Sequence, residues 1–294
     1  MSSAHVLRSL LFAPGNRPEL FAKATASPAD AVILDMEDSV PPAQKALARD
    51  HVAAELAART DRLTFIRINH PDRGELAADL SVLAGHENQA LMIPKISEPS
   101  QLEEIDRQLA AFEARAGLAR DVLSMMPVVE TALGVRNLFD ILSRFPRVRG
   151  AGLASAEQGD LMVELAGQWT PTGEAMSYAR GKFVCDGRAA CARWLIDGAF
   201  MNLADDAALE TETRLGRVMG FNGKIAIHPR QLATINRVFS PTVDEVERAK
   251  AVIAAFREAE AGGRAAVKVR GMMVDYANVR WAEQVLALID VRID

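Results

Sequence analysis

Short apolar runs alternate with longer segments of helical periodicity along most of the chain. Runs of four to eight residues predict strands at 8–13, 31–34, 63–68, 90–94, 123–129, 148–154, 194–201 and 223–227. Each run is followed by a segment whose apolar residues recur at the spacing of a helix. The runs are short and apolar on both faces, which suits a parallel sheet covered by helices.

The repeated strand–helix unit predicts a particular fold class. Eight such units over about 220 residues favour a (β/α)8 TIM barrel over an open doubly wound sheet. No G-x-G-x-x-G motif follows the first predicted strand, which argues weakly against a dinucleotide-binding fold.

The segment after the barrel pattern predicts additional helices. A capping box, Thr242-x-x-Glu245, marks the start of a helix that stops before Gly262. A barrel does not require these pieces. We therefore expect a barrel domain over 1–235 and a C-terminal helical extension over 236–294, which serves as a lid or packs on a neighbouring subunit.

Composition limits the possible partners. The chain has 294 residues, is 49% hydrophobic and carries a net charge of −5 with a pI of about 5.7. A general affinity for nucleic acid or for an anionic membrane is therefore not expected, although a local basic pocket for a phosphate-bearing ligand is allowed. No segment approaches the ~20 apolar residues of a membrane span. Cys185 and Cys191 fit no metal-ligand spacing, so we expect free or buried thiols in a soluble, cytoplasmic protein.

Polar residues follow the predicted strands where a barrel carries its chemistry, at the C-terminal ends. Glu130 ends the apolar run Met125–Val129, and a carboxylate in such a place must be hydrogen-bonded, paired or bound to a metal. The other residues at strand ends are Asp35, Glu37, Asp38, Arg67, Asn69, Lys95, Glu157 and Asp160.

These residues suggest a site for a hard cation. Neighbouring strands lie ~4.8 Å apart, so Glu130 and an acid after the sixth strand, either Glu157 or Asp160, could share one ion. Two carboxylates without histidine or cysteine favour Mg²⁺. Arg67 could then hold a substrate carboxylate or face a developing oxyanion.

Structural interpretations of the same residues stay open. Glu130 could be a helix cap or an ion-pair partner, and Arg67 could belong to a structural ion pair. Asp35 and Asp38 could cap the following helix and pair with Lys45. Glu37, with Asp38 beside it, could instead support the waters of a bound ion.

Seven motifs, taken together, resemble one known family. They are R-S-L-L-F-A-P-G-N-R-P, A-V-I-L-D-M-E-D-S-V, F-I-R-I-N, M-I-P-K-I, V-V-E-T-A-L-G, G-D-L-M-V-E-L-A-G and G-F-N-G-K-I-A-I-H-P-R-Q, in order from Arg8 towards Asp275. The chain thereby resembles the citrate lyase beta-subunit-like proteins of the aldolase/citrate lyase family, which includes malyl-CoA and citramalyl-CoA lyases. The resemblance implies a Mg²⁺-dependent homotrimer or hexamer that cleaves a 3-hydroxyacyl-CoA to acetyl-CoA, or a similar acyl-CoA, and a 2-oxo acid such as glyoxylate or pyruvate.

The resemblance also implies roles for individual residues. Glu130 and Asp160 match the two metal carboxylates, and Arg67 matches the arginine beside the metal. Asp275 matches an aspartate that a neighbouring subunit delivers as general acid/base. The residues that lie where the family meets coenzyme A are Pro14, Gly15, Arg17 and Lys23.

The chain departs from the family pattern at two places, and three other functions stay open. The acids Glu157 and Asp160, adjacent in the family, are separated here by two residues, and Asp275 is followed by Tyr276 rather than closely by proline. The alternatives are an aldolase acting on a free 2-oxo acid, for which His70 is the histidine to test, a malyl-CoA thioesterase, and a subunit that binds but acts only with partner chains.

Overall fold

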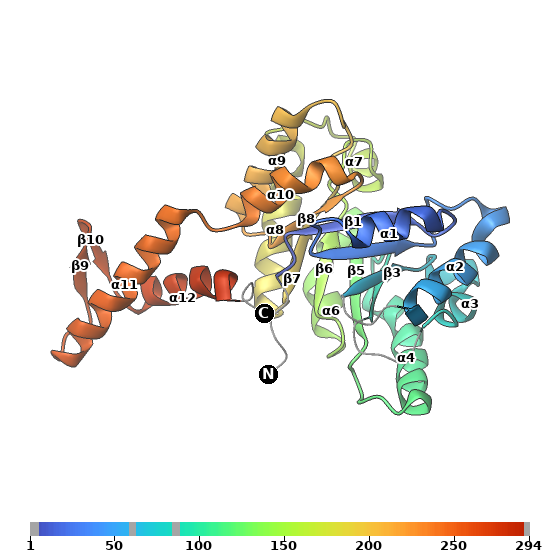
Figure 1. Ribbon diagram of the computed structural model, residues 1–294, viewed down its shortest axis with the longest axis horizontal. Helices are drawn as coiled ribbons and strands as arrows, with labels where there is room; N and C mark the ends of the chain where they lie inside the picture. The colour runs from blue at the N-terminus through green and yellow to red at the C-terminus, as the bar shows by residue number, and fades with distance from the viewer. Residues whose placement is uncertain (1–5, 59–62, 84–88, 291–294) are drawn as a thin grey trace. The chain divides into compact units, whose positions relative to one another are not determined.

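The computed structural model describes residues 6–58, 63–83 and 89–290. Within these residues eight parallel strands close into a barrel, in which β1 pairs with both β2 and β8 (Figure 1). The strands are β1 Ser9–Pro14, β2 Ala31–Asp35, β3 Thr64–Arg67, β4 Gln89–Ile93, β5 Ser124–Val129, β6 Gly150–Leu153, β7 Trp194–Asp197 and β8 Gly223–Ala226. The predicted TIM barrel is confirmed.

Helices follow the strands and pack around the barrel. They are α1 Phe21–Thr25, α2 Lys45–Ala58, α3 Leu76–Leu80, α4 Glu103–Ala116, α5 Ala132–Arg136, α6 Leu138–Ser143, α7 Asp160–Glu164, α8 Ser177–Ala189, α9 Asp206–Met219 and α10 Leu232–Phe239. α9 shows why they begin and end where they do. The side chain of Asp205 accepts a hydrogen bond from Ala208 N at its start, and Gly220 ends it in the left-handed conformation.

The strands bury both of their faces, which explains why their sequences are apolar without alternation. One apolar cluster fills the barrel interior, and a second lies between the barrel and the helices. In β2, for example, Ile33 belongs to the interior cluster and Leu34 to the outer one.

The seventh predicted strand is too long. It was expected to reach residue 201, but β7 ends at Asp197. The backbone N–H of the next residue, Gly198, donates to Ser155 Oγ at 3.1 Å instead of continuing the ladder. An apolar run alone does not reveal this hydrogen bond.

Two glycines of β6 make a matched pair for a stability test. A Cβ on Gly150 would lie 2.3 Å from Trp194 O, whereas a Cβ on Gly152 would meet the Val128 methyl groups at 3.7 Å. We therefore expect Gly150→Ala to lower the free energy of unfolding by about 1–3 kcal/mol through overpacking. Gly152→Ala should cost distinctly less. Urea unfolding of the two variants checks this, and equal losses would contradict it.

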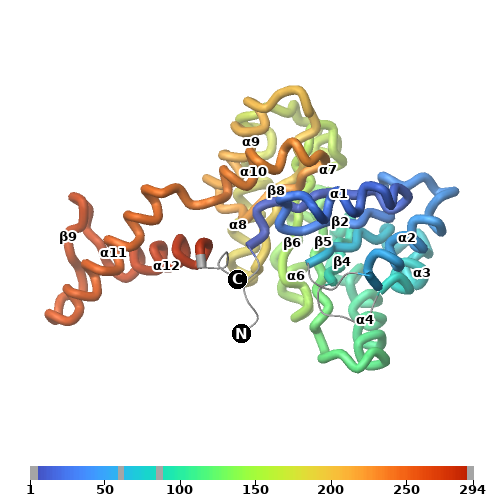
Figure 2. The backbone as a smooth tube through the Cα atoms, viewed as in Figure 1, coloured from blue at the N-terminus to red at the C-terminus, as the bar shows by residue number. Residues whose placement is uncertain are grey.

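The chain divides into two compact units, Leu7–Phe239 and a second that contains the segment from Ser240 onward. Figure 2 traces the backbone of both. The C-terminal unit consists of α11 Val243–Ala261, β9 Val267–Val269, β10 Met272–Val274 and α12 Tyr276–Asp290. The predicted capping box at Thr242 and Glu245 is confirmed.

The C-terminal unit has an apolar core of its own, in which Val252 and Phe256 of α11 pack with Val274 and Ala282. Its two short strands form an antiparallel hairpin. Arg270 and Gly271 between them both have positive φ, which two-residue hairpin turns favour. The sequence predicted only a short segment here, so this hairpin was missed.

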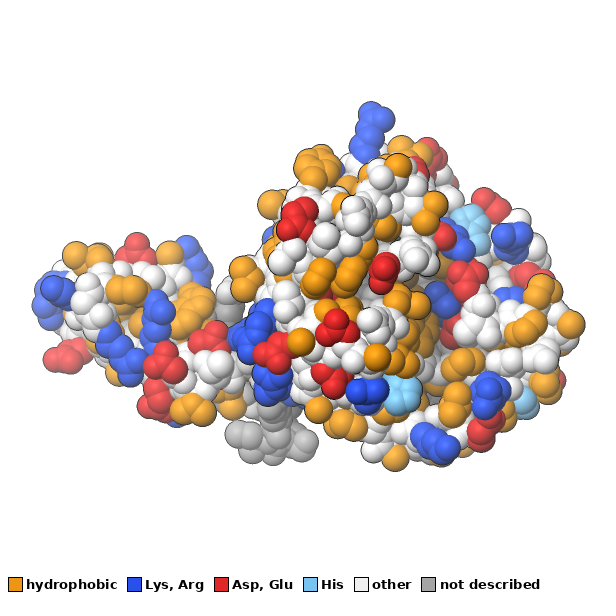
Figure 3. Space-filling model, turned by 90° about the horizontal axis from the view of Figure 1, so that it is seen from above, with side chains coloured by type: hydrophobic (Ala, Val, Ile, Leu, Met, Phe, Trp, Pro, Cys, Tyr) orange, Lys and Arg blue, Asp and Glu red, His pale blue; other side chains and the backbone are white. Residues whose placement is uncertain are grey.

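The molecular surface agrees with the modest net charge. Figure 3 shows acidic and basic side chains interspersed with apolar ones on the face in view. In the part of the chain that the structure describes, no helix is long and apolar enough to cross a membrane.

Candidate metal centre at the strand ends

Asp35 and Arg67 form a buried ion pair at the ends of β2 and β3. The two residues are register partners, so their side chains meet directly. Arg67 Nε and Nη2 donate to Asp35 Oδ1 and Oδ2 at 2.6 and 2.7 Å. Burial opposes the charge, but the Arg67 guanidinium holds the pKa of Asp35 below its usual range. On its other side, the guanidinium lies 4.6 Å from the centre of the Phe12 ring.

This geometry corrects the interpretation of Asp35 and Asp38 as partners of Lys45. Lys45 Nζ donates to the carbonyl oxygens of Met36 and Glu37, both at 2.7 Å. Asp35 instead pairs with Arg67, and it accepts hydrogen bonds from backbone N–H groups of the turn directly after β2, not from the start of α2. Lys45 supports the same turn through its carbonyls, because an ammonium offers donors only.

Lys95, at the end of β4, joins the acids of different strands. Its Nζ lies 3.1 Å from Glu37 Oε1, 3.2 Å from Asp38 Oδ2 and 3.4 Å from Asp160 Oδ2. Its backbone N–H donates to Glu130 Oε1 at 3.2 Å. Lys95 has φ of 58°, an uncommon conformation for a residue other than glycine, and such conformations cluster at functional sites. The sequence shows Lys95 only as a lysine after a proline, and nothing in it predicts that four acids would lie around this residue.

Glu130 is a buried carboxylate with little charge compensation. It follows β5 and is 9% exposed. Burial, and then the charge of Glu37, raise the pKa of Glu130 to about 7. Glu37 Oε2 is also buried and makes no hydrogen bond within the described residues, although Arg67 Nη1 lies 3.2 Å away. Burial raises the pKa of Glu37 as well. The site is therefore short of positive charge.

The donor set fits a hard divalent cation. Asp35, Glu37, Asp38, Glu130 and Asp160 are five carboxylates set against three cations, Arg67, Lys95 and the nearby Lys45. Carboxylate oxygens are the ligands that Mg²⁺ prefers. Among the residues described, no three His, Cys, Asp or Glu side chains form a ready metal cage. A cation held by fewer protein ligands keeps positions for water or substrate oxygens, which is usual for Mg²⁺.

The two candidate ligands after β6 differ in their surroundings. Asp160, the first residue of α7, reaches Lys95 Nζ, which also contacts Glu37. Both acids are exposed, but Glu157 has no ion pair or hydrogen bond to the side chains that the structure describes. The geometry thus connects Asp160, and not Glu157, with the rest of the site.

A cavity of about 700 Å³ opens beside these acids. Basic, polar and acidic groups line it, including Lys45, Arg73, His70 and Glu75. Both ring nitrogens of His70 are engaged away from Glu130 and Asp160. Its Nδ1 accepts a hydrogen bond from Asp72 N at 3.3 Å, and its Nε2 lies 3.4 Å from Gln101 Nε2. The cavity adjoins the site through Glu37 and Lys95.

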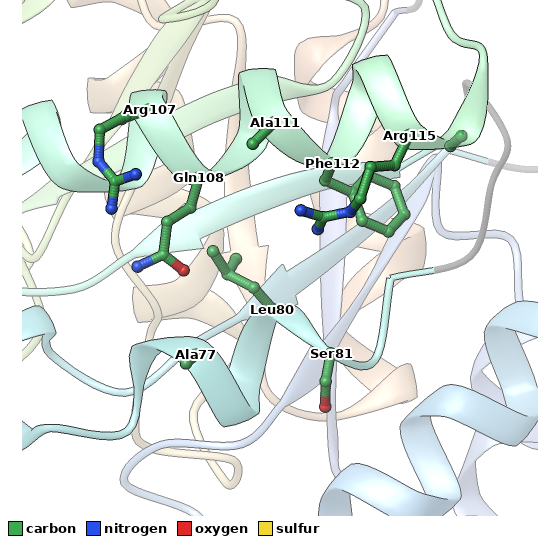
Figure 4. A pocket seen from close by; sticks show the side chains of 9 residues that line it. Ala77, Leu80, Ser81, Arg107, Gln108, Ala111, Phe112 and Arg115 are labelled. Atoms are coloured by element: carbon green, nitrogen blue, oxygen red, sulfur yellow. The ribbon is translucent and has the colours of Figure 1, made fainter.

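A second hollow is not connected with this chemistry. It measures about 650 Å³ and lies between α3 and α4, with Leu80 and Ser81 opposite Gln108 and Phe112 (Figure 4). None of the strand-end acids lines it. We therefore place the candidate site at the strand ends.

The residues expected at coenzyme A lie at the end of β1, on the turn after it and on α1, and Gly15 contacts the site. Gly15 N donates to Asp35 O at 2.7 Å, and a Cβ on Gly15 would lie 2.7 Å from the same oxygen. Only glycine allows this approach of the turn after Pro14 to β2. Arg17 is exposed and pairs with Glu19, and Lys23 is exposed on α1.

Asp275 belongs to the C-terminal unit. Its Oδ1 accepts hydrogen bonds from Ala277 N at 2.8 Å and Asn278 N at 3.4 Å, so it caps the start of α12. Its catalytic role stays a prediction.

A closed barrel with acids gathered at its strand ends defines the class of TIM-barrel enzymes that work at this face. A family model described as HpcH/HpaI aldolase/citrate lyase matches residues 8–229, and one described as a carbon–carbon bond lyase of the TIM-barrel fold matches residues 176–291. The chain belongs to the HpcH/HpaI aldolase/citrate lyase family. The predicted family and the predicted class of carbon–carbon lyase are confirmed.

Similar proteins cover nearly the whole chain. A (3S)-malyl-CoA thioesterase of Cereibacter sphaeroides is 35% identical over 97% of this chain and 95% of its own length. An L-malyl-CoA/beta-methylmalyl-CoA lyase of the same species is 31% identical over 95% and 93%. The crystal structure of CitE from Mycobacterium tuberculosis with magnesium, acetoacetate and coenzyme A is 28% identical, covers 96% of this chain and 98% of that one, and has a TM-score of 0.76.

Proposed function

We propose that the chain is a Mg²⁺-dependent lyase that cleaves a malyl-CoA or citramalyl-CoA type thioester. The products are an acyl-CoA such as acetyl-CoA and a 2-oxo acid, glyoxylate or pyruvate. The observation that carries this proposal is that Lys95 contacts Glu130 through its backbone N–H and Asp160 through its Nζ, within an excess of carboxylates. The similarity to a malyl-CoA lyase, and to a structure that holds magnesium and coenzyme A, supports it.

Glu130 and Asp160 would hold the ion, and Glu37 and Asp38 would hydrogen-bond its waters. When bound, Mg²⁺ supplies Lewis-acid polarisation and a template for the oxygens of the oxo acid. The chain's own contribution is to keep both carboxylates close to Lys95, which also lines the cavity. Lys45, Arg73 and Lys95 line this cavity, and their positive charges would suit an anionic ligand such as a thioester of coenzyme A.

Arg67 would stabilise the negative charge that develops on the enolate oxygen. Its orientation is fixed by Asp35, and the neighbouring acids raise its pKa despite burial, so it stays cationic. Because the guanidinium is held before substrate arrives, little reorganisation is needed during the reaction.

We expect Arg67→Lys to lower kcat/KM by about 100-fold or more, because an ammonium cannot hold Asp35 in a fork and face the enolate at once. Mg²⁺ affinity should change much less, because Arg67 is not proposed as a ligand. Steady-state kinetics with a metal titration check this. Arg73→Lys, in the lining of the cavity, is the control. Equal effects of the two substitutions would count against the role of Arg67.

Asp275, from a neighbouring subunit of a homotrimer or hexamer, would exchange the proton at the acyl-CoA methyl carbon. Asp275→Asn tests this cleanly, because asparagine also caps helices well and should preserve α12. We expect a loss of deuterium exchange at the acetyl-CoA methyl group, with unchanged Mg²⁺ affinity and melting temperature. Exchange at the wild-type rate would show that Asp275 is only a cap.

One assay distinguishes the proposal from the alternatives. The purified chain is offered L-malyl-CoA and (S)-citramalyl-CoA with Mg²⁺ and again with EDTA, and all products are identified. A lyase releases glyoxylate or pyruvate together with acetyl-CoA. A thioesterase, which the 35% identical relative favours, releases malate or citramalate and free coenzyme A. Aldol cleavage of a free hydroxylated 2-oxo acid, without coenzyme A, that His70→Ala abolishes would indicate an aldolase. Magnesium binding without turnover of any thioester would indicate a partner-dependent subunit.

A further inference from the structure

We propose that a basic pocket at the opposite end of the barrel binds a phosphate-bearing anion. The pocket has a volume of about 690 Å³. Two of its arginines, Arg149 and Arg193, immediately precede β6 and β7, and a third, Arg144, follows α6. Residues that precede parallel strands lie at the N-terminal face of the barrel. The candidate metal centre lies at the C-terminal ends of the strands, so this pocket is separate from it.

The charges that line the basic pocket all have one sign. Among the described residues it is lined by three arginines and by no Asp or Glu. Arg149 Nη2 donates to the carbonyl oxygen of Asp121 at 2.9 Å, and Arg193 lies 5.9 Å from the Trp194 ring centre. Neither has a carboxylate within ion-pair distance in the described part of the chain.

A neighbouring arginine shows what full compensation looks like. Arg147 is completely buried and pairs with Asp106, Glu113 and Asp121 at 2.6 to 2.9 Å. These contacts raise the pKa of Arg147 despite its burial. The nearby acids are therefore engaged by Arg147, and the half-buried Arg149 is left without one.

The pocket's electrostatics favour an anion. Burial, and then the charge of Arg193, lower the pKa of Arg149, which means that its positive charge is disfavoured where it lies. A phosphate between the two guanidinium groups would relieve this repulsion, and the planar fork of arginine matches phosphate oxygens. Arg144 pairs with Glu103 in an exposed bridge and contributes less.

The size and the apolar wall of the basic pocket point to an organic phosphate. Its volume falls within the roughly 300–1,000 Å³ of small-molecule sites. Phe139 and Phe145 also line it, which gives the non-phosphate part of a ligand an aromatic surface. The ligand would bind apart from the reacting thioester.

The two cysteines provide a local readout. Both are exposed, but only Cys191 lines the pocket, while Cys185 lies on α8 outside its lining. The full chain is treated with iodoacetamide in EDTA buffer, with and without pyrophosphate at matched ionic strength, and each alkylation rate is measured by peptide mass spectrometry. We expect alkylation of Cys191 to slow by about threefold or more, and that of Cys185 to stay constant, because the anion covers only one thiol.

Substitutions make the test specific. Arg193→Gln should raise the pyrophosphate concentration for half protection of Cys191 by about tenfold, the loss of roughly one charge-assisted contact. Arg107→Gln removes the same charge from α4 and should change nothing. Arg149→Gln, measured at a temperature equally far below its own melting temperature, should raise this concentration by a similar factor. An unchanged Cys191 rate, equal slowing of both thiols, or an effect of Arg107→Gln as large as that of Arg193→Gln would overturn the proposal.

Discussion

Glu130→Gln is expected to abolish Mg²⁺-dependent cleavage, with a loss of about 1,000-fold or more, because a metal ion supplies several kcal/mol of transition-state stabilisation. Glutamine keeps the shape of the side chain and one oxygen but removes its charge. In the fold that charge is met by the nearby charges of Arg67 and Lys95 and by one hydrogen bond from the backbone N–H of Lys95, and together they do not offset its burial. A charge that burial disfavours in the fold is what we expect of a residue that binds a cation.

The same substitution should leave the fold intact. Burial raises the pKa of Glu130 to about 7, so its ionised form is disfavoured in the folded chain. Because the usual value is 4.5, the metal-free chain loses stability as pH rises from that value towards 7, and glutamine removes this loss. We expect the melting temperature of metal-free Glu130→Gln at pH 8 to equal or exceed that of the wild type. Retained metal-dependent cleavage, or a clearly lower melting temperature, would contradict this account.

Asp197→Asn is expected to cause the largest loss of stability, about 3–5 kcal/mol, because it breaks a fully buried ion cluster. Asp197 accepts hydrogen bonds from Lys224 Nζ at 3.0 Å and from Arg180 Nε at 3.1 Å. Ser155 Oγ donates to it at 2.7 Å. Glu212 completes the cluster through Arg180 and Lys224. Without the aspartate charge, two buried cations share one carboxylate.

The pH dependence of this loss has a definite sign. Burial alone would raise the pKa of Asp197, but the charges of Lys224 and Arg180 lower it from 3.8 to about 2. A lowered carboxyl pKa stabilises the fold above the unfolded value, and this contribution disappears as pH falls towards the folded one. Urea unfolding should therefore show a smaller difference between wild type and variant at pH 3 than at pH 7. Asp186→Asn, which removes a partner of Lys182 on α8, is the control and should cost about 0.5 kcal/mol or less. Similar losses for both variants, or a pH-independent difference, would contradict the prediction.

The ion cluster also supports the candidate site. Ser155 lies just beyond β6, at the start of the loop that leads to Asp160. Its hydroxyl contacts Asp197, Arg180 and Gly198, so one end of this loop is held by the cluster. We therefore expect a loss of this cluster to loosen the loop that carries Asp160.

The sequence predicts the barrel because a strand buried on both faces, followed by a helix, is repeated often enough to define the fold. It also predicts which end carries the acids, since Glu130 directly follows an apolar run. It does not predict the pairing of Asp35 with Arg67, which depends on the stagger between β2 and β3. Nor does it predict the position of Lys95 Nζ, which depends on one residue with positive φ.

The buried charges are the hardest feature to predict. Asp197 and Lys224 are register partners at β7 and β8, and both are fully buried. Arg180 and Glu212 reach them from α8 and α9. A charged residue within a helical pattern normally indicates a solvated face, so only the packing of the helices on the barrel reveals that these four neutralise one another.

The central claim is that Glu130 and Asp160 together form the cation site. Its most direct test is a titration of the metal-free chain with Mn²⁺, a hard cation that electron paramagnetic resonance detects, compared with Asp160→Asn and Glu157→Gln. We predict a single class of Mn²⁺ site. Asp160→Asn should lower its affinity by about 100-fold, as is usual for the loss of a metal ligand or of a residue that supports one, and Glu157→Gln should leave the affinity unchanged. Binding that Glu157→Gln weakens and Asp160→Asn does not, or no binding by the wild-type chain, would contradict it.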